Sequence, residues 1–200
     1  MGLNSFQTSG NSPGDLDRCH IGILGFGTVG SAVARRLASP DVHPLLALTH
    51  ICDRRAREQR GRQVEPLAQR SWTDRFDDLL ASDIDIIVEA VPGSEPAVDY
   101  IRAALLAGKS VVTANRQVIA HHGPALLTLA ERQGRQIRFE AAVGGAMPLV
   151  HGVGAALAGD RLLRIDAILN ATSNVVLSRL EAGGTVDEAI AEACASGLTE

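Results

Sequence analysis

The sequence predicts an α/β protein whose larger domain is a doubly wound parallel sheet. Short apolar runs alternate strictly with segments of helical periodicity between residues 19 and 140, an order typical of parallel sheets. Hydrophobic residues make up 46% of the chain but aromatic residues only 3%, so the core must consist of Ala, Val, Leu and Ile. That mixture suits short buried strands packed under helices.

The elements of this domain follow one another in βα order. Val29, Val33 and Leu37 recur at four-residue intervals directly after a glycine turn, which indicates the first helix. Strands are expected at residues 19–24, 45–52, 84–91, 110–113 and 137–140, and further helices at 73–80, 95–107 and 123–133. Residues 56–70 have no assignable pattern. Residues 1–17, rich in Gly, Ser, Asn and Pro, predict a disordered tail.

The pattern changes close to Gly145. Residues 143–148 predict a turn, followed by a helix at 149–158, a strand at 161–169 and helices near 173–181 and 186–195. We therefore expect one domain at residues 18–145 and a second part at 146–200. The second part has only 55 residues, too few for a comfortable independent core, so we interpret it as the incomplete start of an α+β domain.

The segment GFGTVG at residues 25–30 predicts a dinucleotide-binding Rossmann domain. Its G-x-G-x-x-G spacing follows a strand and opens a helix, which is the context in which the motif binds a pyrophosphate. The helix amino terminus adds free N–H groups and the positive end of the helix dipole. The cofactor-binding residues predicted from the motif are Gly25, Phe26, Gly27, Thr28, Val29 and Gly30.

Two further segments are candidates for contact with the cofactor. Asp53 follows the second strand, 23 residues after Gly30, where an acid accepts hydrogen bonds from the ribose hydroxyls of NAD. Arg54 and Arg55 come next and could instead pair with the 2′-phosphate of NADP, so the choice stays open with a slight preference for NAD. Thr113, Asn115 and Arg116 follow another strand, at the sheet edge where nicotinamide and substrate should meet.

One carboxylate and three histidines have a structural as well as a functional interpretation. Glu140 ends a predicted strand beside a turn with exposed carbonyls, which could hold a monovalent cation, although a structural hinge is the simpler interpretation. His121 and His122 precede a helix in a polar stretch and indicate a solvated helix entry. His151 lies in a helix of small residues and indicates an interior histidine rather than a catalyst.

Composition excludes several classes of protein. The net charge is −4, with no basic block and few aromatic residues for base stacking, so a nucleic-acid partner is not expected. No apolar stretch approaches the ~20 residues of a membrane span. The amino terminus lacks a secretion signal, so we expect a cytoplasmic protein without a membrane partner.

Several segments together resemble homoserine dehydrogenase. The similarity lies in the motifs at residues 21–30, 111–116, 139–148, 168–174 and 195–200, in the same order and spacing, and it extends over residues 19–200. The resemblance implies a Rossmann domain followed by a catalytic and dimerisation domain. It also implies a homodimer that reduces aspartate 4-semialdehyde to L-homoserine with NAD(P)H, in threonine and methionine biosynthesis.

The resemblance also implies roles for individual residues. Glu140 with the carbonyls of Val143, Gly145 and Met147 matches the family's sodium site. Glu200 matches the glutamate that contacts the substrate amino group, and with Arg116 it completes the candidate catalytic residues.

Three departures from the family pattern bear on activity. Arg116 stands where relatives usually have Lys, and arginine does not readily release a proton. Ala171 replaces a glycine, which would block a backbone that needs positive φ. The chain ends at Glu200, before the segment that carries the family's catalytic lysine, so we expect these residues alone to be inactive. The alternatives are a catalytically inactive dinucleotide-binding module or an oxidoreductase for another small amino acid or aldehyde.

Overall fold

The computed structural model describes residues 18–63, 65–145 and 147–196, which form two compact units with the boundary between Phe139 and Glu140. This boundary lies six residues before the one expected after Gly145. The tail expected at residues 1–17, and Glu200, lie outside the described residues.

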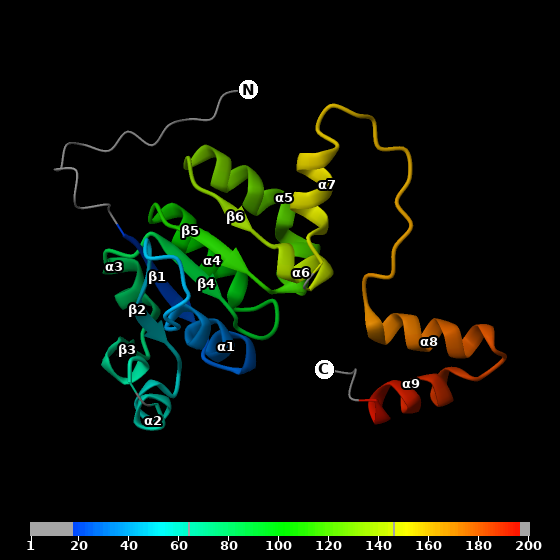
Figure 1. The fold of residues 1–200 in the computed structure, drawn as a ribbon, viewed down its shortest axis with the longest axis horizontal. Helices are drawn as coiled ribbons and strands as arrows, with labels where there is room; N and C mark the ends of the chain where they lie inside the picture. The colour runs from blue at the N-terminus through cyan, green and yellow to red at the C-terminus, as the bar shows by residue number, and fades with distance from the viewer. Residues whose placement is uncertain (1–17, 64, 146, 197–200) are drawn as a thin grey trace. The chain divides into compact units, whose positions relative to one another are not determined.

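The amino-terminal unit contains a six-stranded parallel sheet with the strand order β3-β2-β1-β4-β5-β6 (Figure 1). The chain runs outward from β1 to β3, then returns to the other side of β1 for β4 to β6, which confirms the doubly wound fold. This reversal beside β1 creates the crevice in which such sheets bind ligands. The strands are β1 Cys19–Leu24, β2 Leu46–Cys52, β3 Ser71–Thr73, β4 Ile86–Glu89, β5 Ser110–Thr113 and β6 Ile137–Arg138.

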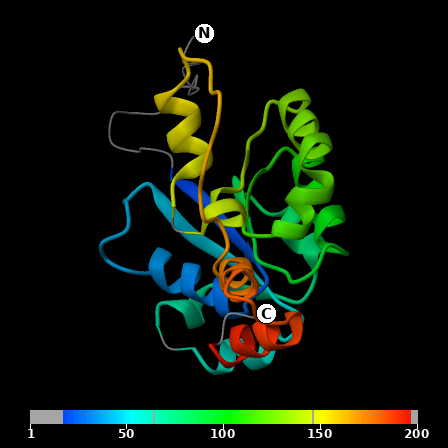
Figure 2. The same cartoon turned by 90° about the vertical axis from the view of Figure 1, so that its right-hand side faces the viewer.

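Helices cover both faces of the sheet, as the two views in Figures 1 and 2 show. One buried cluster joins Ile23, Leu48 and Ile51 to Ala34 of the first helix. A larger cluster on the other face joins Ile87 to the helices that follow β3, β4 and β5. The helices are α1 Thr28–Leu37, α2 Ala56–Gly61, α3 Phe76–Ala81, α4 Ala97–Leu106 and α5 Arg116–Arg132, with a 3₁₀ turn at Leu67–Gln69.

Several elements of this unit differ from the sequence prediction, among them helix α2, which lies where no pattern was assigned. The short edge strand β3 had no periodic signal of its own, since three residues are too few to show alternation. Helix α5 begins at Arg116 rather than at residue 123, because the side chain of Asn115 caps it. His121 and His122 therefore lie inside a helix, not at its entry. Strand β6 ends at Arg138, so the prediction that Glu140 ends a strand is wrong.

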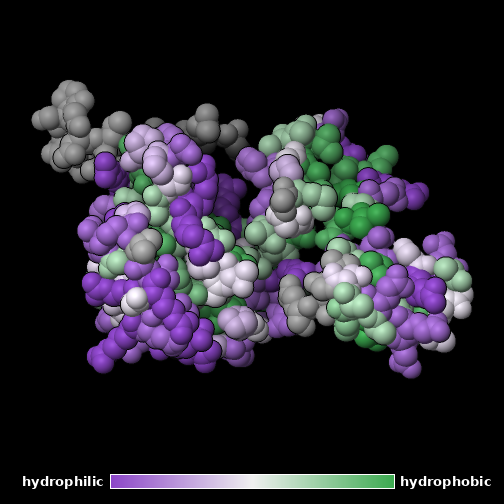
Figure 3. Space-filling model, turned by 60° about the horizontal axis from the view of Figure 1, so that its bottom comes forward, coloured by the Kyte–Doolittle hydropathy of each residue, from purple (hydrophilic) through white to green (hydrophobic). Residues whose placement is uncertain are grey.

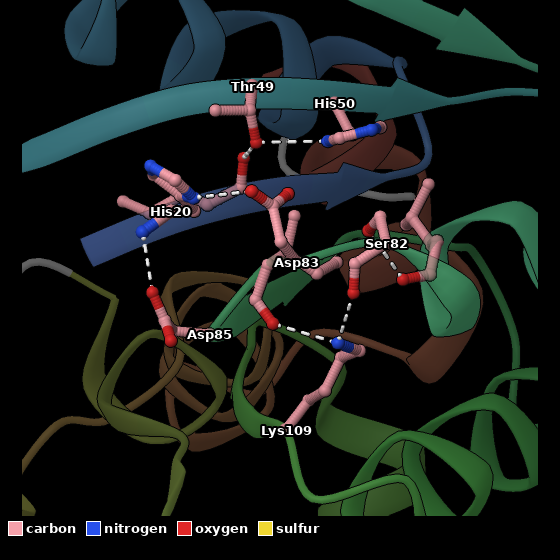
Figure 4. A network of polar contacts seen from close by, with 10 residues as sticks. His20, Thr49, His50, Ser82, Asp83, Asp85 and Lys109 are labelled. Carbon is pink, nitrogen blue, oxygen red and sulfur yellow. Dashed lines mark hydrogen bonds and ion pairs between the residues drawn. The ribbon is translucent and has the colours of Figure 1, made fainter. Parts of the chain in front are cut away.

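At the edge of the sheet where the strands begin, opposite the crevice, a buried lysine side chain links neighbouring loops (Figure 4). Lys109 is the only lysine in the sequence and is 8% exposed. Its Nζ donates hydrogen bonds to the carbonyls of Ser82 and Ile84, at 2.8 and 2.9 Å. Nearby, the backbone N–H of His20 donates to the Asp85 carboxylate at 2.7 Å. These contacts join the turn before β4 to the beginnings of β1 and β5.

The carboxyl-terminal unit is helical in its described residues. Its helices are α6 Glu140–Gly144, α7 Leu149–Ala156, α8 Ala171–Glu181 and α9 Val186–Ala195. Helices α8 and α9 form a hairpin in which Ala189 and Ala193 are buried. Ala171 is the first residue of α8, and no described non-glycine residue has a positive φ. The expected conflict at Ala171 is therefore wrong, because the helical backbone there suits alanine.

The strand predicted at residues 161–169 is wrong. These residues have no regular structure, because a strand needs a hydrogen-bonded neighbour and no described residue pairs with them. The apolar side chains that suggested a strand are solvent-exposed instead, Leu163 by 83% and Ile168 by 67%. Apolar surface is correspondingly abundant on this unit, where it is green in Figure 3.

Candidate cofactor-binding site

The glycines of the loop after β1 have different environments. Gly25 has φ +93°, and a Cβ atom there would lie 2.7 Å from the carbonyl oxygen of Ala90. A Cβ atom on Gly30 would lie only 1.8 Å from the carbonyl oxygen of Gly25. At Gly27 the same atom would meet nothing within 4 Å. Two glycines therefore allow close packing, whereas Gly27 faces open space.

The open space lies at the amino terminus of α1. Gly27 is the N-cap residue and offers no side chain to the first turn, which also contains no acidic residue. Thr28 and Val29 are exposed. Uncapped N–H groups and the helix dipole together favour an anion at such a terminus. The loop can therefore accept a phosphate group at Gly27.

Asp53 lies beside this loop and is bonded to it. Its Oδ2 atom accepts a hydrogen bond from the backbone N–H of Phe26, and its Oδ1 atom accepts one from the backbone N–H of Arg55, both at 2.8 Å. The N–H of Gly25 donates to the carbonyl of Cys52, the residue before Asp53. Each carboxylate oxygen still has acceptor capacity for a hydroxyl group. Asp53 can therefore position the loop and accept from a ribose.

Phe26 contributes its backbone to the site and its side chain to the core. The residue is only 3% exposed, and its ring packs edge-on against Trp72, with 4.7 Å between the ring centroids. Trp72 donates its indole N–H to the carbonyl of Leu67. Because Trp72 is the only tryptophan in the chain, its fluorescence reports on the glycine loop.

A buried polar network that the sequence analysis missed joins the ends of β4 and β5. Glu89 is 1% exposed and accepts hydrogen bonds from the N–H of Val91 at 2.7 Å and the hydroxyl of Thr113 at 2.5 Å. The Thr113 hydroxyl in turn accepts from the N–H of Asn115. Burial raises the pKa of the Glu89 carboxyl, although the bonds from Thr113, Val91 and Asn115 oppose this. The only sign of this residue in the sequence was an acid near the end of an apolar run.

Asn115 is committed to contacts within the protein. Its side-chain oxygen accepts from the N–H of Val118 and so caps α5. Its amide nitrogen donates to the carbonyls of Val91 and Gly93, at 3.1 and 2.6 Å. The residue is 9% exposed, so it holds the loop after β4 against the start of α5. The next residue, Arg116, is exposed.

The predicted cofactor residues thus gather at the carboxyl ends of neighbouring strands. The glycine loop follows β1, Asp53 and the exposed Arg54 follow β2, and Thr113 ends β5. These strands are adjacent in the sheet together with β4. The residues predicted to bind a cation belong to the other unit and are described by themselves.

Glu140, the carboxylate of that second site, accepts backbone hydrogen bonds in this structure. Its two oxygens accept from the N–H groups of Val150 and His151, in the first turn of α7, at 2.8 and 3.0 Å. The carbonyl of Met147 accepts from Leu149. Among the described residues no group of three or more His, Cys, Asp or Glu could hold a metal ion.

The switch point beside β1, the open space at Gly27 and the acid after β2 define a dinucleotide-binding protein of the Rossmann class. Residues 25–140 match a family model described as homoserine dehydrogenase, NAD binding domain, and residues 148–200 match one described as homoserine dehydrogenase. The chain therefore belongs to the homoserine dehydrogenase family, whose members are oxidoreductases.

Individual relatives agree with this assignment. The homoserine dehydrogenase of Mycobacterium tuberculosis is 38% identical over 196 residues, which are 94% of this chain and 43% of that protein. The crystal structure of a homoserine dehydrogenase from Thiobacillus denitrificans has a TM-score of 0.71 at 30% identity, covering 92% of this chain and 43% of that one. A hyperthermophilic archaeal homoserine dehydrogenase in complex with NADPH has a TM-score of 0.72 at 29% identity, covering 92% and 62%.

The chain spans about two fifths of the length of the curated relatives it matches. No helix among the described residues is both long and apolar enough to cross a membrane.

Proposed function

We propose that this chain provides the cofactor-binding part of a homoserine dehydrogenase, the enzyme that interconverts aspartate 4-semialdehyde and L-homoserine. Bound NAD(P)H supplies the hydride that reduces the aldehyde to a primary alcohol. The observation that carries the proposal is the open space at Gly27, at the uncapped start of α1 and beside Asp53. The family membership gives the reaction.

Each part of the cofactor has a proposed partner. The pyrophosphate binds at the backbone of Gly27, Thr28 and Val29, where N–H groups are available. The adenosine ribose binds at Asp53, whose carboxylate can accept from hydroxyl groups. The nicotinamide lies toward the ends of β4 and β5, near Thr113 and Arg116.

The form of the cofactor depends on two opposing features after β2. Asp53 favours NAD because its charge repels a 2′-phosphate, whereas Arg54 and Arg55 can pair with that phosphate. The archaeal relative binds NADPH, which supports NADP for this family. Because Asp53 is fixed by Phe26 and Arg55, we retain the preference for NAD.

Arg116 and Glu200 are the proposed contacts to the substrate. The guanidinium of Arg116, at the start of α5, suits the α-carboxylate of an amino-acid substrate. Glu200 would bind the substrate amino group. Neither is proposed as the proton donor, since arginine stays charged and a carboxylate that binds an ammonium group stays ionised.

Lys109 is the only lysine of these 200 residues and does not qualify as the general acid–base lysine that the family resemblance implies. It is buried at the amino-terminal edge of the sheet, where two carbonyls hold its ammonium group. The cofactor is proposed at the opposite edge. We therefore infer that these 200 residues, when isolated, bind the cofactor but do not turn over substrate. This supports the second candidate function, a dinucleotide-binding module without catalysis.

A sodium ion is proposed at Glu140, Val143, Gly145 and Met147. All of the proposed ligands are oxygen atoms, which suits a hard cation. Glu140 would have to share its oxygens with the N–H groups of Val150 and His151. The thermal midpoint of the wild type, compared with Glu140→Gln in sodium and in choline chloride, tests this proposal. A sodium-dependent increase confined to the wild type supports the site, and equal midpoints contradict it.

We also propose a homodimer formed by the segment after residue 152. Leu163, Ile168 and Leu177 are each more than half exposed, and unpartnered apolar surface of this kind marks an interaction site. Light scattering over a concentration series tests it. A species at twice 21.0 kDa supports the dimer, and a constant monomer mass contradicts it. The cytoplasmic location and the absence of nucleic-acid and membrane partners stay predictions from the sequence.

Energy transfer from Trp72 tests the proposed function. Its emission overlaps the absorption of reduced nicotinamide, and it packs on Phe26 within the glycine loop. Titration with NADH and NADPH should quench the tryptophan with saturation, and NAD or NADP should compete. Absence of saturable quenching and competition up to millimolar cofactor would contradict the proposal.

A further inference from the structure

We propose that Glu89 is a positioning residue that sets the nicotinamide half of the cofactor site through Val91, Thr113 and Asn115. The inference rests on the proposed function, because it assumes that the dinucleotide binds at the glycine loop. It concerns a residue that touches no cofactor atom itself and acts through the loops that do.

Glu89 lies where three strand ends meet. In the parallel register it is the partner of Leu24 at the end of β1 and of Thr113 at the end of β5. The following residue, Ala90, lies against Gly25, whose Cβ position is 2.7 Å from the Ala90 carbonyl oxygen. The backbone directly after Glu89 therefore lies against the first glycine of the loop.

The side chain of Glu89 fixes the two loops beyond β4 and β5. One oxygen accepts the N–H of Val91 and so turns the chain after β4. The other accepts the hydroxyl of Thr113, which holds the N–H of Asn115. Asn115 then clamps the carbonyls of Val91 and Gly93 and caps α5. The contacts form a closed circuit around one carboxyl group.

These hydrogen bonds lie where the nicotinamide half of the cofactor is expected to bind. A dinucleotide crosses the crevice at the switch point, with its pyrophosphate at the glycine loop. The adenosine half lies toward β2, where Asp53 is the proposed ribose partner. The nicotinamide half therefore lies over β4 and β5, whose following loops are held by Glu89.

A carboxyl group suits this circuit better than an amide of the same size. Both oxygens of Glu89 accept hydrogen bonds, from an N–H and from an O–H. A glutamine has one acceptor and one donor group, so its NH₂ must face either Val91 N–H or the Thr113 hydroxyl. If that hydroxyl turned to accept, its own hydrogen would lose its partner. Glu89→Gln thus disturbs the loops without changing side-chain volume.

The test separates the two halves of the cofactor by calorimetry on the whole chain. NADH contains both halves, whereas ADP-ribose lacks the nicotinamide. Glu89→Gln and Thr113→Val should lower NADH affinity about tenfold, the scale of one lost hydrogen bond in a buried network, and change ADP-ribose affinity less than about twofold. Thr113→Ser keeps the hydroxyl and should retain the wild-type affinity for both ligands.

The matched control is Glu131→Gln, an exposed acid near the end of α5, which should leave both affinities unchanged. Equal losses for the two ligands would show a general structural role and overturn the proposal, as would unchanged NADH affinity in Glu89→Gln. Should Glu89→Gln fail to fold, the Thr113 pair decides alone. If the wild type binds neither of these ligands nor NADPH, the proposed function itself fails, which is a different result.

Discussion

Replacing Gly30 by alanine should destabilise the amino-terminal unit much more than the same change at Gly27. The Cβ atom added by Gly30→Ala would lie 1.8 Å from the carbonyl oxygen of Gly25, far below the 3.4 Å at which ordinary contact begins. The obstacle is a backbone atom and cannot rotate away, so α1 must move from the loop. Overpacking typically costs about 1–3 kcal/mol, and we take the upper value here.

Helix propensity offsets part of that loss. Replacing glycine by alanine inside a helix contributes about 1 kcal/mol of stability, which leaves a net loss of about 2 kcal/mol for Gly30→Ala. Gly27 has φ −80° at the N-cap and an open Cβ position, so Gly27→Ala should lower stability by less than about 1 kcal/mol, the difference between glycine and alanine as N-cap residues. The two variants therefore form a matched pair within one motif.

Urea unfolding followed by Trp72 fluorescence measures both variants, because this tryptophan packs on Phe26 in the same unit. A loss of about 2 kcal/mol is a large part of a typical stability of about 5–15 kcal/mol. Equal unfolding free energies for Gly30→Ala and the wild type would refute the packing argument. A similar loss of unfolding free energy in both variants would show that the backbone around Gly27 has no room for a Cβ atom.

Three further predictions concern other residues of this unit. Lys109→Met removes two hydrogen bonds from an ammonium group to buried carbonyls and should lower the urea unfolding free energy by about 2 kcal/mol; an unchanged midpoint would contradict this. Asp53→Ala should weaken NADH binding more than NADPH binding, because it removes the acceptor for the ribose hydroxyls, and a proportional loss of both in a fluorescence titration would show that Asp53 does not read the ribose. Burial raises the pKa of Glu89 above its ordinary value of 4.5, so the stability due to its neutral form is complete below pH 4.5 and is lost as the pH rises through the folded-state pKa. The difference in unfolding free energy between wild type and Glu89→Gln should therefore shrink as the pH is raised above 4.5, and a constant difference would refute the assignment.

The periodic and motif-bearing parts of the fold were predictable from the sequence. Four-residue spacing located α1, and the glycine loop and Asp53 were placed by their positions after apolar runs. The short strand β3 was not predicted because three residues are too few to show an alternating pattern. Residues 161–169 were wrongly predicted to form a strand, because alternation shows that a strand can form but not that a partner strand is present.

The polar circuit of the candidate site was only partly predictable. Thr113 and Asn115 were recognised as residues at a strand end, but their inward contacts depend on Glu89, which arrives from a strand 24 residues earlier. A single sequence does not show that such residues meet. The same holds for Glu140, whose hydrogen bonds to Val150 and His151 depend on where α7 begins.

Cofactor binding by Gly27→Val tests the proposed pyrophosphate site, since the added side chain would occupy the open space at this glycine. Gly154→Val is the control, because its Cβ atom also meets nothing within 4 Å but lies in α7 of the other unit. Titration with NADH and NADPH, read by energy transfer from Trp72, should show saturable binding for the wild type and the control and none for Gly27→Val. The unfolding free energies of the three proteins should be equal. Wild-type affinity in Gly27→Val would contradict the account, because the cofactor would then have to bind elsewhere.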